Sequence, residues 1–169
     1  MDLGVLVQNA RDDQWREVII LACGAARPKE SNEIILGIIK KGRNTKKEEV
    51  QAQLYLLAAA CTEVAIEVAS KTIEKVQKHL STIVPPKDLR SAKLLVVAGD
   101  MVLPYLKYDK KRSLKELVPS IRTLGLIGGE IALNILQDYT RDTREGIQEA
   151  IMYNLNFIEN KEEYFSSLL

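Results

Sequence analysis

The sequence predicts an all-α protein, a right-handed array of antiparallel helical hairpins with about ten helices. Apolar residues recur at spacings of three and four along segment after segment, as they do on one face of a helix. Capping residues, prolines and glycines separate these segments, and no stretch alternates between apolar and polar residues as a half-buried strand does. We expect a single domain over residues 1–169, whose sub-units, if it divides, are 12–84 and 87–169.

The first two predicted helices lie before residue 44. Asp12 or Asp13 caps the first helix, whose apolar residues share one face, and Pro28 ends it. Ser31 caps the second helix, which has lysines in its last turn and ends at Gly42.

Two further helical segments complete the first half. Thr45 and Glu48 have the spacing of a capping box at the start of a third, longer helix. Residues 70–80 again carry one apolar face, and the pattern is compatible with either a break or continuity at Ser70. A double proline at 85–86 ends this half.

The second half repeats the same kind of pattern. A helix over residues 89–98 is followed by Gly99, and Asp100 caps the next, short helix. Ser113 with Glu116 forms another capping box, and Pro119 starts a core-facing helix. A Gly-Gly turn then leads to a return helix, and the last two helices are capped by Asp142 with Glu145, ending near Ile158, and by Asn160 with Glu163.

An internal repeat is the most informative feature of the second half. Sliding the chain by thirty residues places Gly99 on Gly129 and Asp100 on Glu130, with leucines coinciding on both sides. Glycine permits the positive φ that ends one helix, and the acidic residue stabilises the free amides at the start of the next. Two hairpins of this period predict a HEAT-like α-solenoid.

Composition and charge exclude several functional classes. Lys plus Arg number 24 and Asp plus Glu 23, so the formal charge of +1 does not favour a strongly basic nucleic-acid binder. His79 is the one histidine, and we interpret the hydroxyl residues near it in sequence, Ser81 and Thr82, as part of the turn before the double proline rather than as nucleophiles. We interpret Cys23 and Cys61 as small core residues, and we expect no close pair among the two cysteines and His79. The sequence therefore predicts no enzyme, no metal and no cofactor.

The beginning of the chain has neither a basic region nor a long apolar run of the secretory type. The longest apolar stretches are too short to cross a bilayer, for which roughly 20 residues are needed. We therefore expect a cytoplasmic protein without a membrane partner.

Two basic clusters are the candidate nucleic-acid contacts. Loops rich in lysine and arginine can bind phosphates, although solvated loops with basic residues at helix ends explain such runs more simply. The candidate residues are Lys40, Lys41, Arg43, Lys46 and Lys47 in one cluster and Lys110, Lys111 and Arg112 in the other.

Four segments of the chain carry short motifs of a known kind. Residues 15–22 read Trp-Arg-Glu-Val-Ile-Ile-Leu-Ala, which resembles the apolar helix after the nucleotide-binding part of prokaryotic STAND NTPases, in which helical repeats follow the NACHT module. Residues 124–133, Leu-Gly-Leu-Ile-Gly-Gly-Glu-Ile-Ala-Leu, are similar to a helix-turn-helix of those repeats, and residues 98–104 resemble the hairpin one unit earlier. Phe157 with the Glu-Glu-Tyr sequence at 162–164 is similar to an element near the end of that region.

The ATP-hydrolysing machinery of that family has no counterpart in this sequence. Its nearest match to a phosphate-binding loop, residues 37–44, has Arg-Asn where Lys-Ser or Lys-Thr is needed and follows an apolar helix rather than a strand. The resemblance therefore implies a regulatory or sensor region without nucleotide chemistry.

These observations predict a non-catalytic helical scaffold for protein–protein contacts. It would bind a protein partner or associate with itself through the ends of the solenoid, where apolar residues gather at Leu3, Val5, Leu6 and Val7 and at Phe165, Leu168 and Leu169. The alternative is a nucleic-acid-binding repeat protein that uses the two basic clusters. An enzyme on a helical scaffold is the third hypothesis, and no constellation of residues supports it.

Overall fold

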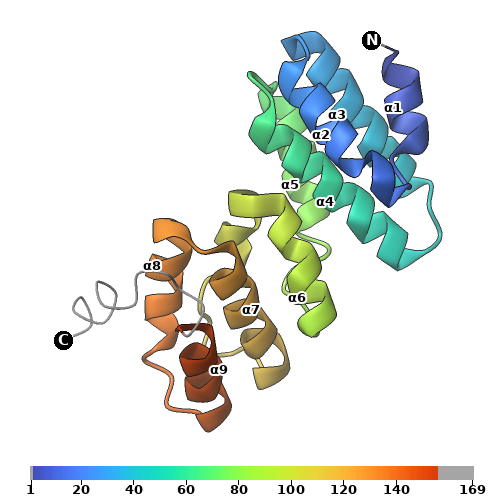
Figure 1. The fold of residues 1–169 in the computed structure, drawn as a ribbon. Helices are drawn as coiled ribbons and strands as arrows, with labels where there is room; N and C mark the ends of the chain where they lie inside the picture. The colour runs from blue at the N-terminus through green and yellow to red at the C-terminus, as the bar shows by residue number, and fades with distance from the viewer. Residues whose placement is uncertain (1, 156–169) are drawn as a thin grey trace. The chain divides into compact units, whose positions relative to one another are not determined.

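The computed structural model describes residues 2–155, which form nine α-helices and two 3-10 segments and contain no strand (Figure 1). The prediction of an all-α protein is confirmed for these residues. The chain divides into two compact units, the first comprising residues up to Ile83 with Val97–Met101 and the second Val84–Val96 with the described residues from Val102 onward. The predicted helix end near Ile158 and the Asn160 cap lie outside the described residues.

The first unit begins with α1 (Leu3–Asn9), which Asp2 caps. A 3-10 segment (Asp13–Trp15) follows and leads directly into α2 (Arg16–Ala25). Asp12 acts as a cap, as predicted, but it caps the 3-10 segment rather than α2 itself.

The next helix, α3 (Pro28–Arg43), begins earlier and ends later than predicted. Proline fits the first helical position because the amide there has no helical partner, so Pro28 opens α3. Ser31 is not a cap; it is buried inside α3, and its hydroxyl donates a hydrogen bond to a backbone carbonyl of α2 at 3.0 Å. Gly42 is not a stop either, because it lies within α3, where an added Cβ would come within 2.7 Å of the Tyr55 ring.

The predicted capping box of Thr45 and Glu48 does not form. The Thr45 hydroxyl instead donates to the Lys41 carbonyl at 3.0 Å, and α4 (Glu48–Val64) begins without a side-chain cap. A break separates α4 from α5 (Ser70–Leu80).

The core of the first unit lies between its longest helices. α3 packs along α4, while α2 and α5 contact α4 and α1 contacts α3. The isoleucines that share one face of α3 meet apolar residues of α2 and α4 there, which is the outcome expected of an amphipathic helix. The central side chains are at most 1% exposed: Ile19, Ile34, Ile35, Ile38, Leu54 and Cys61.

The second unit contains α6 (Leu89–Leu95), α7 (Leu114–Ile127), α8 (Gly129–Tyr139) and α9 (Glu145–Leu155). A 3-10 segment (Val96–Tyr105) follows α6, and its residues 97–101 belong to the first unit. The predicted helix over 89–98 therefore ends early, at Leu95. α7 contacts α6, α8 and α9.

The start of α7 confirms one prediction and corrects another. Ser113 and Glu116 form the expected capping box, in which the Ser113 hydroxyl donates to the Glu116 carboxylate at 2.8 Å. Pro119 does not start a helix, because it lies inside α7, where it removes one helical hydrogen bond. The residues on the buried side of this unit are fully shielded from solvent: Leu106, Leu117, Ile121, Leu136, Tyr139 and Ile147.

Candidate functional site

A groove of about 510 Å³ lies in the second unit, and three helices line it. α6 contributes Leu89 and Lys93, and α7 contributes Val118 and Arg122, each pair separated by one helical turn. α9 contributes five residues at helical spacing: Gly146, Glu149, Ala150, Tyr153 and Asn154. The groove therefore has apolar, basic and acidic side chains within one concave surface.

The Arg122 side chain is held in place at the groove. Its guanidinium carbon lies 4.5 Å from the centroid of the Tyr153 ring, in a cation–π contact. Its Nη1 atom donates to Oδ1 of Asn154 at 3.3 Å, and Asn154 is itself 2% exposed. The cation is thus fixed by two residues of α9 before any ligand arrives.

Helix caps determine which residues line the groove. The Asp88 carboxylate accepts the Ser91 amide at 2.7 Å, which starts α6 immediately before Leu89. This hydrogen bond lowers the pKa of Asp88. The capping box of α7 likewise lowers the pKa of Glu116, chiefly through the Ser113 hydroxyl. With its register fixed in this way, α7 buries Leu117 and leaves Val118 in the groove.

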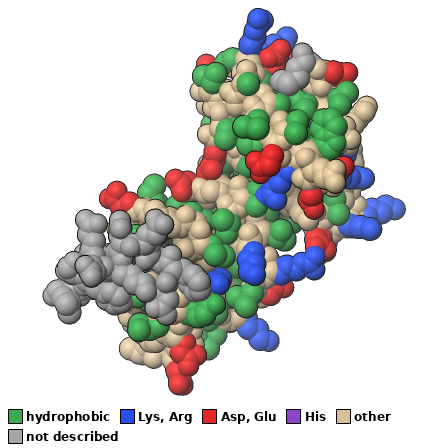
Figure 2. Space-filling view, in the orientation of Figure 1, with side chains coloured by type: hydrophobic (Ala, Val, Ile, Leu, Met, Phe, Trp, Pro, Cys, Tyr) green, Lys and Arg blue, Asp and Glu red, His purple; other side chains and the backbone are tan. Residues whose placement is uncertain are grey.

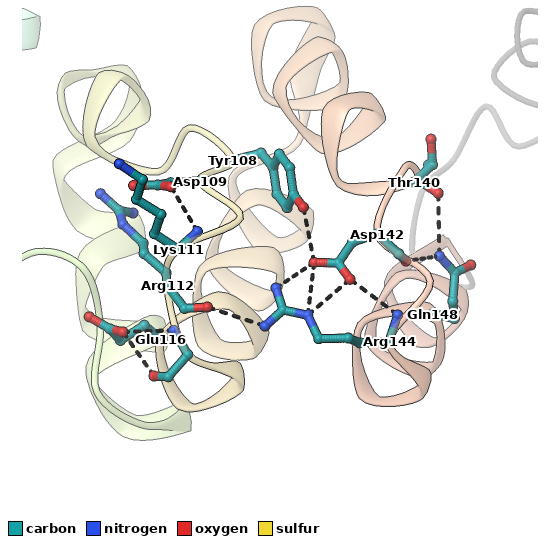
Figure 3. A network of polar contacts seen from close by, with 10 residues as sticks. Tyr108, Asp109, Lys111, Arg112, Glu116, Thr140, Asp142, Arg144 and Gln148 are labelled. Atoms are coloured by element: carbon teal, nitrogen blue, oxygen red, sulfur yellow. Dashed lines mark hydrogen bonds and ion pairs between the residues drawn. The ribbon is translucent and has the colours of Figure 1, made fainter.

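A polar network holds the connection between α8 and α9 (Figure 3). Asp142 is only 6% exposed, and its carboxylate accepts the Nε atom of Arg144 at 2.9 Å and the Tyr108 hydroxyl at 3.1 Å. Arg144 also donates to the Arg112 carbonyl at 3.2 Å, and Gln148 donates to the Thr140 carbonyl at 3.3 Å. The guanidinium of Arg144 holds the pKa of Asp142 well below its usual range. These bonds fix the start of α9, where Gly146 faces the groove.

The predicted turn glycines both have positive φ. Gly99 has φ 51° and ψ −133°, and Gly129 has φ 77° beside Gly128 at 68°. In the first unit, the carboxylate of Glu63 accepts the Met101 amide at 3.1 Å and would overlap a Cβ at position 99. Glu63 also accepts the Asp100 amide, and partial burial raises the pKa of Glu63.

The acidic residues of the repeat do not act alike. Asp100 follows Gly99 on the exposed surface, and it is Glu63 that binds the free amides there. Glu130 is exposed in the first turn of α8, where its charge favours the positive end of the helix dipole.

The structure pairs the two cysteines, contrary to the expectation that they lie apart. Cys23 in α2 and Cys61 in α4 are both fully buried, and their thiols are neighbours. The adjacent Cys23 thiol and burial raise the pKa of Cys61, and both residues are free thiols. Sequence spacing gave no signal of this pair because it depends on how α2 packs on α4. Among residues 2–155, no three or more potential ligands from His, Cys, Asp and Glu form a metal-binding group.

The first basic cluster is partly engaged in structural contacts. Lys41 donates to the carbonyl of Val7 at 3.0 Å and to that of Gln8, which caps the end of α1. Lys40, Arg43, Lys46 and Lys47 are exposed, all in the first unit.

The second basic cluster belongs to the second unit. Lys110 and Lys111 are exposed, whereas Arg112 is half-buried and donates to the Tyr105 carbonyl at 3.2 Å. Figure 2 shows Lys and Arg side chains interspersed with Asp and Glu on the visible face. Nucleic-acid binding by either cluster stays a prediction.

Exposed apolar residues occur in both units, as Figure 2 shows for one face. On α1, Val5 is 39% exposed while Leu6 is buried. The terminal residues Phe165, Leu168 and Leu169 lie outside the described part of the chain. Self-association through the ends therefore stays a prediction. None of the helices described in residues 2–155 is both long and apolar enough to cross a membrane.

No protein-family model, curated protein or solved structure matches this chain. Its candidate site is therefore defined by geometry alone. The sequence pattern does not single out Lys93, Arg122 or Tyr153, because the groove forms only when α6 and α9 pack on α7. The available signal was the spacing within each helix, which places, for example, Val118 and Arg122 on the same face of α7.

Proposed function

We propose that the protein is a non-catalytic helical scaffold that binds partner proteins through the groove of α6, α7 and α9. In this proposal it is a cytoplasmic regulatory module related to the helical repeats of NACHT-type signalling NTPases. The groove carries the proposal, because it combines apolar walls with an arginine that is already held in position. The sequence resemblance supports the regulatory role, and the two free thiols fit a reducing compartment.

The solvent exposure of the groove's rim favours a protein ligand over a small molecule. Leu89 is 58% exposed and Tyr153 is 54% exposed, although both are large and can bury substantial apolar area. A small molecule is usually buried to about 70–90% in its pocket, whereas a peptide covers a wide rim. A partner that covers Leu89 and Tyr153 gains hydrophobic free energy from both.

We further propose that the hairpins stack as a HEAT-like array. The support comes from hydrogen bonds between residues 31 to 33 positions apart in the second unit. The pairs are Thr123 with the Ala92 carbonyl, Tyr139 with the Leu106 carbonyl and Arg144 with the Arg112 carbonyl. Contacts at nearly constant sequence separation are typical of repeats that contact their neighbours.

Filling the groove tests the proposed function. Position 146 accepts a side chain, because a Cβ there would meet only the Leu114 side chain, at 3.8 Å. Peptides selected from a random phage-displayed library on the full chain should bind the Gly146→Phe variant at least about tenfold more weakly. The matched control, Gly146→Ala, leaves the groove open and should bind them as the native chain does. Failure to select peptides, or equal binding to both variants, would contradict the proposal.

A further inference from the structure

The groove lining carries two basic side chains and one acidic side chain. Lys93 and Arg122 lie on the α6 and α7 side, and Glu149 is the one acidic side chain of the lining. Lys93 is exposed and forms no ion pair with any residue in the range 2–155. A ligand that brings carboxylates to the α6 and α7 side therefore meets two cations, and a basic ligand meets repulsion there.

The backbone of the groove favours a helical ligand. All three lining elements are α-helices, whose amides and carbonyls bond within each helix, so the walls offer no strand edge to an extended peptide. A helix satisfies its own backbone and needs only side-chain contacts. From Gly146 to Tyr153 the α9 wall rises by about 10 Å, which is the length of roughly two helical turns.

Small residues allow such a helix to approach closely. Gly146 and Ala150 lie one turn apart on α9, and a Cβ added at Gly146 would contact only the Leu114 side chain, at 3.8 Å. Opposite them, Leu89 and Val118 supply apolar contact surface. An apolar stripe on the ligand can therefore lie between α9 and these two side chains.

We propose that the groove binds an amphipathic helix of a partner protein, with its apolar stripe in the groove and carboxylates flanking that stripe beside Lys93 and Arg122. This inference rests on the proposed function and names the chemistry of the partner. It requires both the shape of the groove and its charge.

Two stapled helical peptides of about 14 residues serve as probes, since unstapled helices of that length are marginal alone. Both have leucines at helical spacing; one carries flanking glutamates and the other flanking lysines. Binding is followed by NMR through the methyl groups of Leu89, Val118 and Ala150 in the full chain. The glutamate peptide should shift these signals with an affinity at least about tenfold higher than that of the lysine peptide.

Charge reversal at Lys93 tests the acidic partner separately from the proposed function of the groove. Lys93→Glu should weaken the glutamate peptide by about tenfold and strengthen the lysine peptide, while Lys110→Glu, the same change at an exposed loop position, should alter neither. Equal binding of both peptides in the groove would overturn the acidic partner and leave the proposed function standing. No shift with either peptide, when library peptides still bind, would overturn the helical ligand.

The chain's own acidic segment is the competing occupant. Residues 156–169 include Phe157, Tyr164 and three glutamates. If Phe157→Glu with Tyr164→Glu shifts the groove methyl signals without any peptide, that segment occupies the groove and the partner proposal is wrong. Unchanged signals support the partner.

Discussion

His79 is the chain's one histidine, so its titration is read without overlap. Its ring stacks on Tyr55 with the centroids 4.4 Å apart. Burial, followed by the positive charges of Arg43 and Lys78, lowers the pKa of His79. We expect the NMR titration midpoint to lie below the usual value of about 6.5, because the folded protein favours the neutral ring.

The sign of the pH dependence follows from that shift. Stability from His79 is complete above a pH of about 6.5, declines as the pH falls below it, and levels off below the folded-state pKa. Arg43→Gln should raise the pKa of His79, whereas Lys71→Gln, two turns away on α5, should leave it unchanged. An unchanged midpoint in Arg43→Gln would exclude repulsion by Arg43 as a cause of the lowered pKa.

Asp142 has the opposite pH dependence. Arg144 lowers the pKa of Asp142 in the folded state below the value of about 4 expected in the unfolded chain. The contribution of Asp142 to stability is therefore present above a pH of about 4 and is lost as the pH falls toward the folded-state pKa. Asp142→Asn should reduce the free energy of unfolding at neutral pH by about 1–3 kcal/mol, because it weakens hydrogen bonds to a charged group. Urea unfolding measures this loss.

Asp138→Asn is the matched control for Asp142. Asp138 pairs with Arg141 at 3.6 Å, but the two side chains are 56% and 79% exposed. An exposed pair of this kind contributes about 0–1 kcal/mol. Equal losses in the two variants would show that the buried network of Figure 3 adds nothing beyond a surface ion pair.

At the scale of elements, the two glycine turns differ in what surrounds them. Gly99→Ala must adopt a strained positive φ and also displace Glu63, while at Gly129 a Cβ meets nothing within 4 Å. We expect Gly129→Ala to cost about 1–2 kcal/mol from backbone strain and Gly99→Ala to cost more. Chemical unfolding of both variants checks the order, and in a Glu63→Ala background the two costs should converge. Equal costs in the native background would contradict the steric account.

Two capping boxes of identical spacing show how far sequence reasoning reaches at this scale. Ser113 and Glu116 form their box, whereas Thr45 bonds to the Lys41 carbonyl and accepts Arg11 at 2.5 Å. The first box depends on four neighbouring residues, whereas the second is overridden by contacts from Arg11, which follows α1, and from Lys41 in α3. Local signals predicted the helical class and the positive φ of Gly99 and Gly129, while the groove depends on packing that no local pattern encodes.

On the scale of the whole molecule, each unit buries its own core. The sequence predicts a boundary between sub-units at the double proline after residue 84. In the structure, the continuous part of the first unit ends close by, at Ile83. The return of Val97–Met101 to the first unit has no such signal, because Glu63 binds the amides of Asp100 and Met101 from a position far away in sequence.

Separate cores predict separate opening of the two units. Ile35 and Ile121 are each fully buried, one in each unit, so Ile35→Ala and Ile121→Ala form a matched pair. Each should cost about 2–5 kcal/mol through the cavity left behind. In hydrogen exchange at low denaturant, Ile35→Ala should accelerate exchange in α3 and α4, and Ile121→Ala in α7 and α9, each leaving the other unit's rates unchanged. If either variant accelerates exchange equally throughout the chain, the two units unfold as one cooperative body, and the division into two cores has no energetic counterpart.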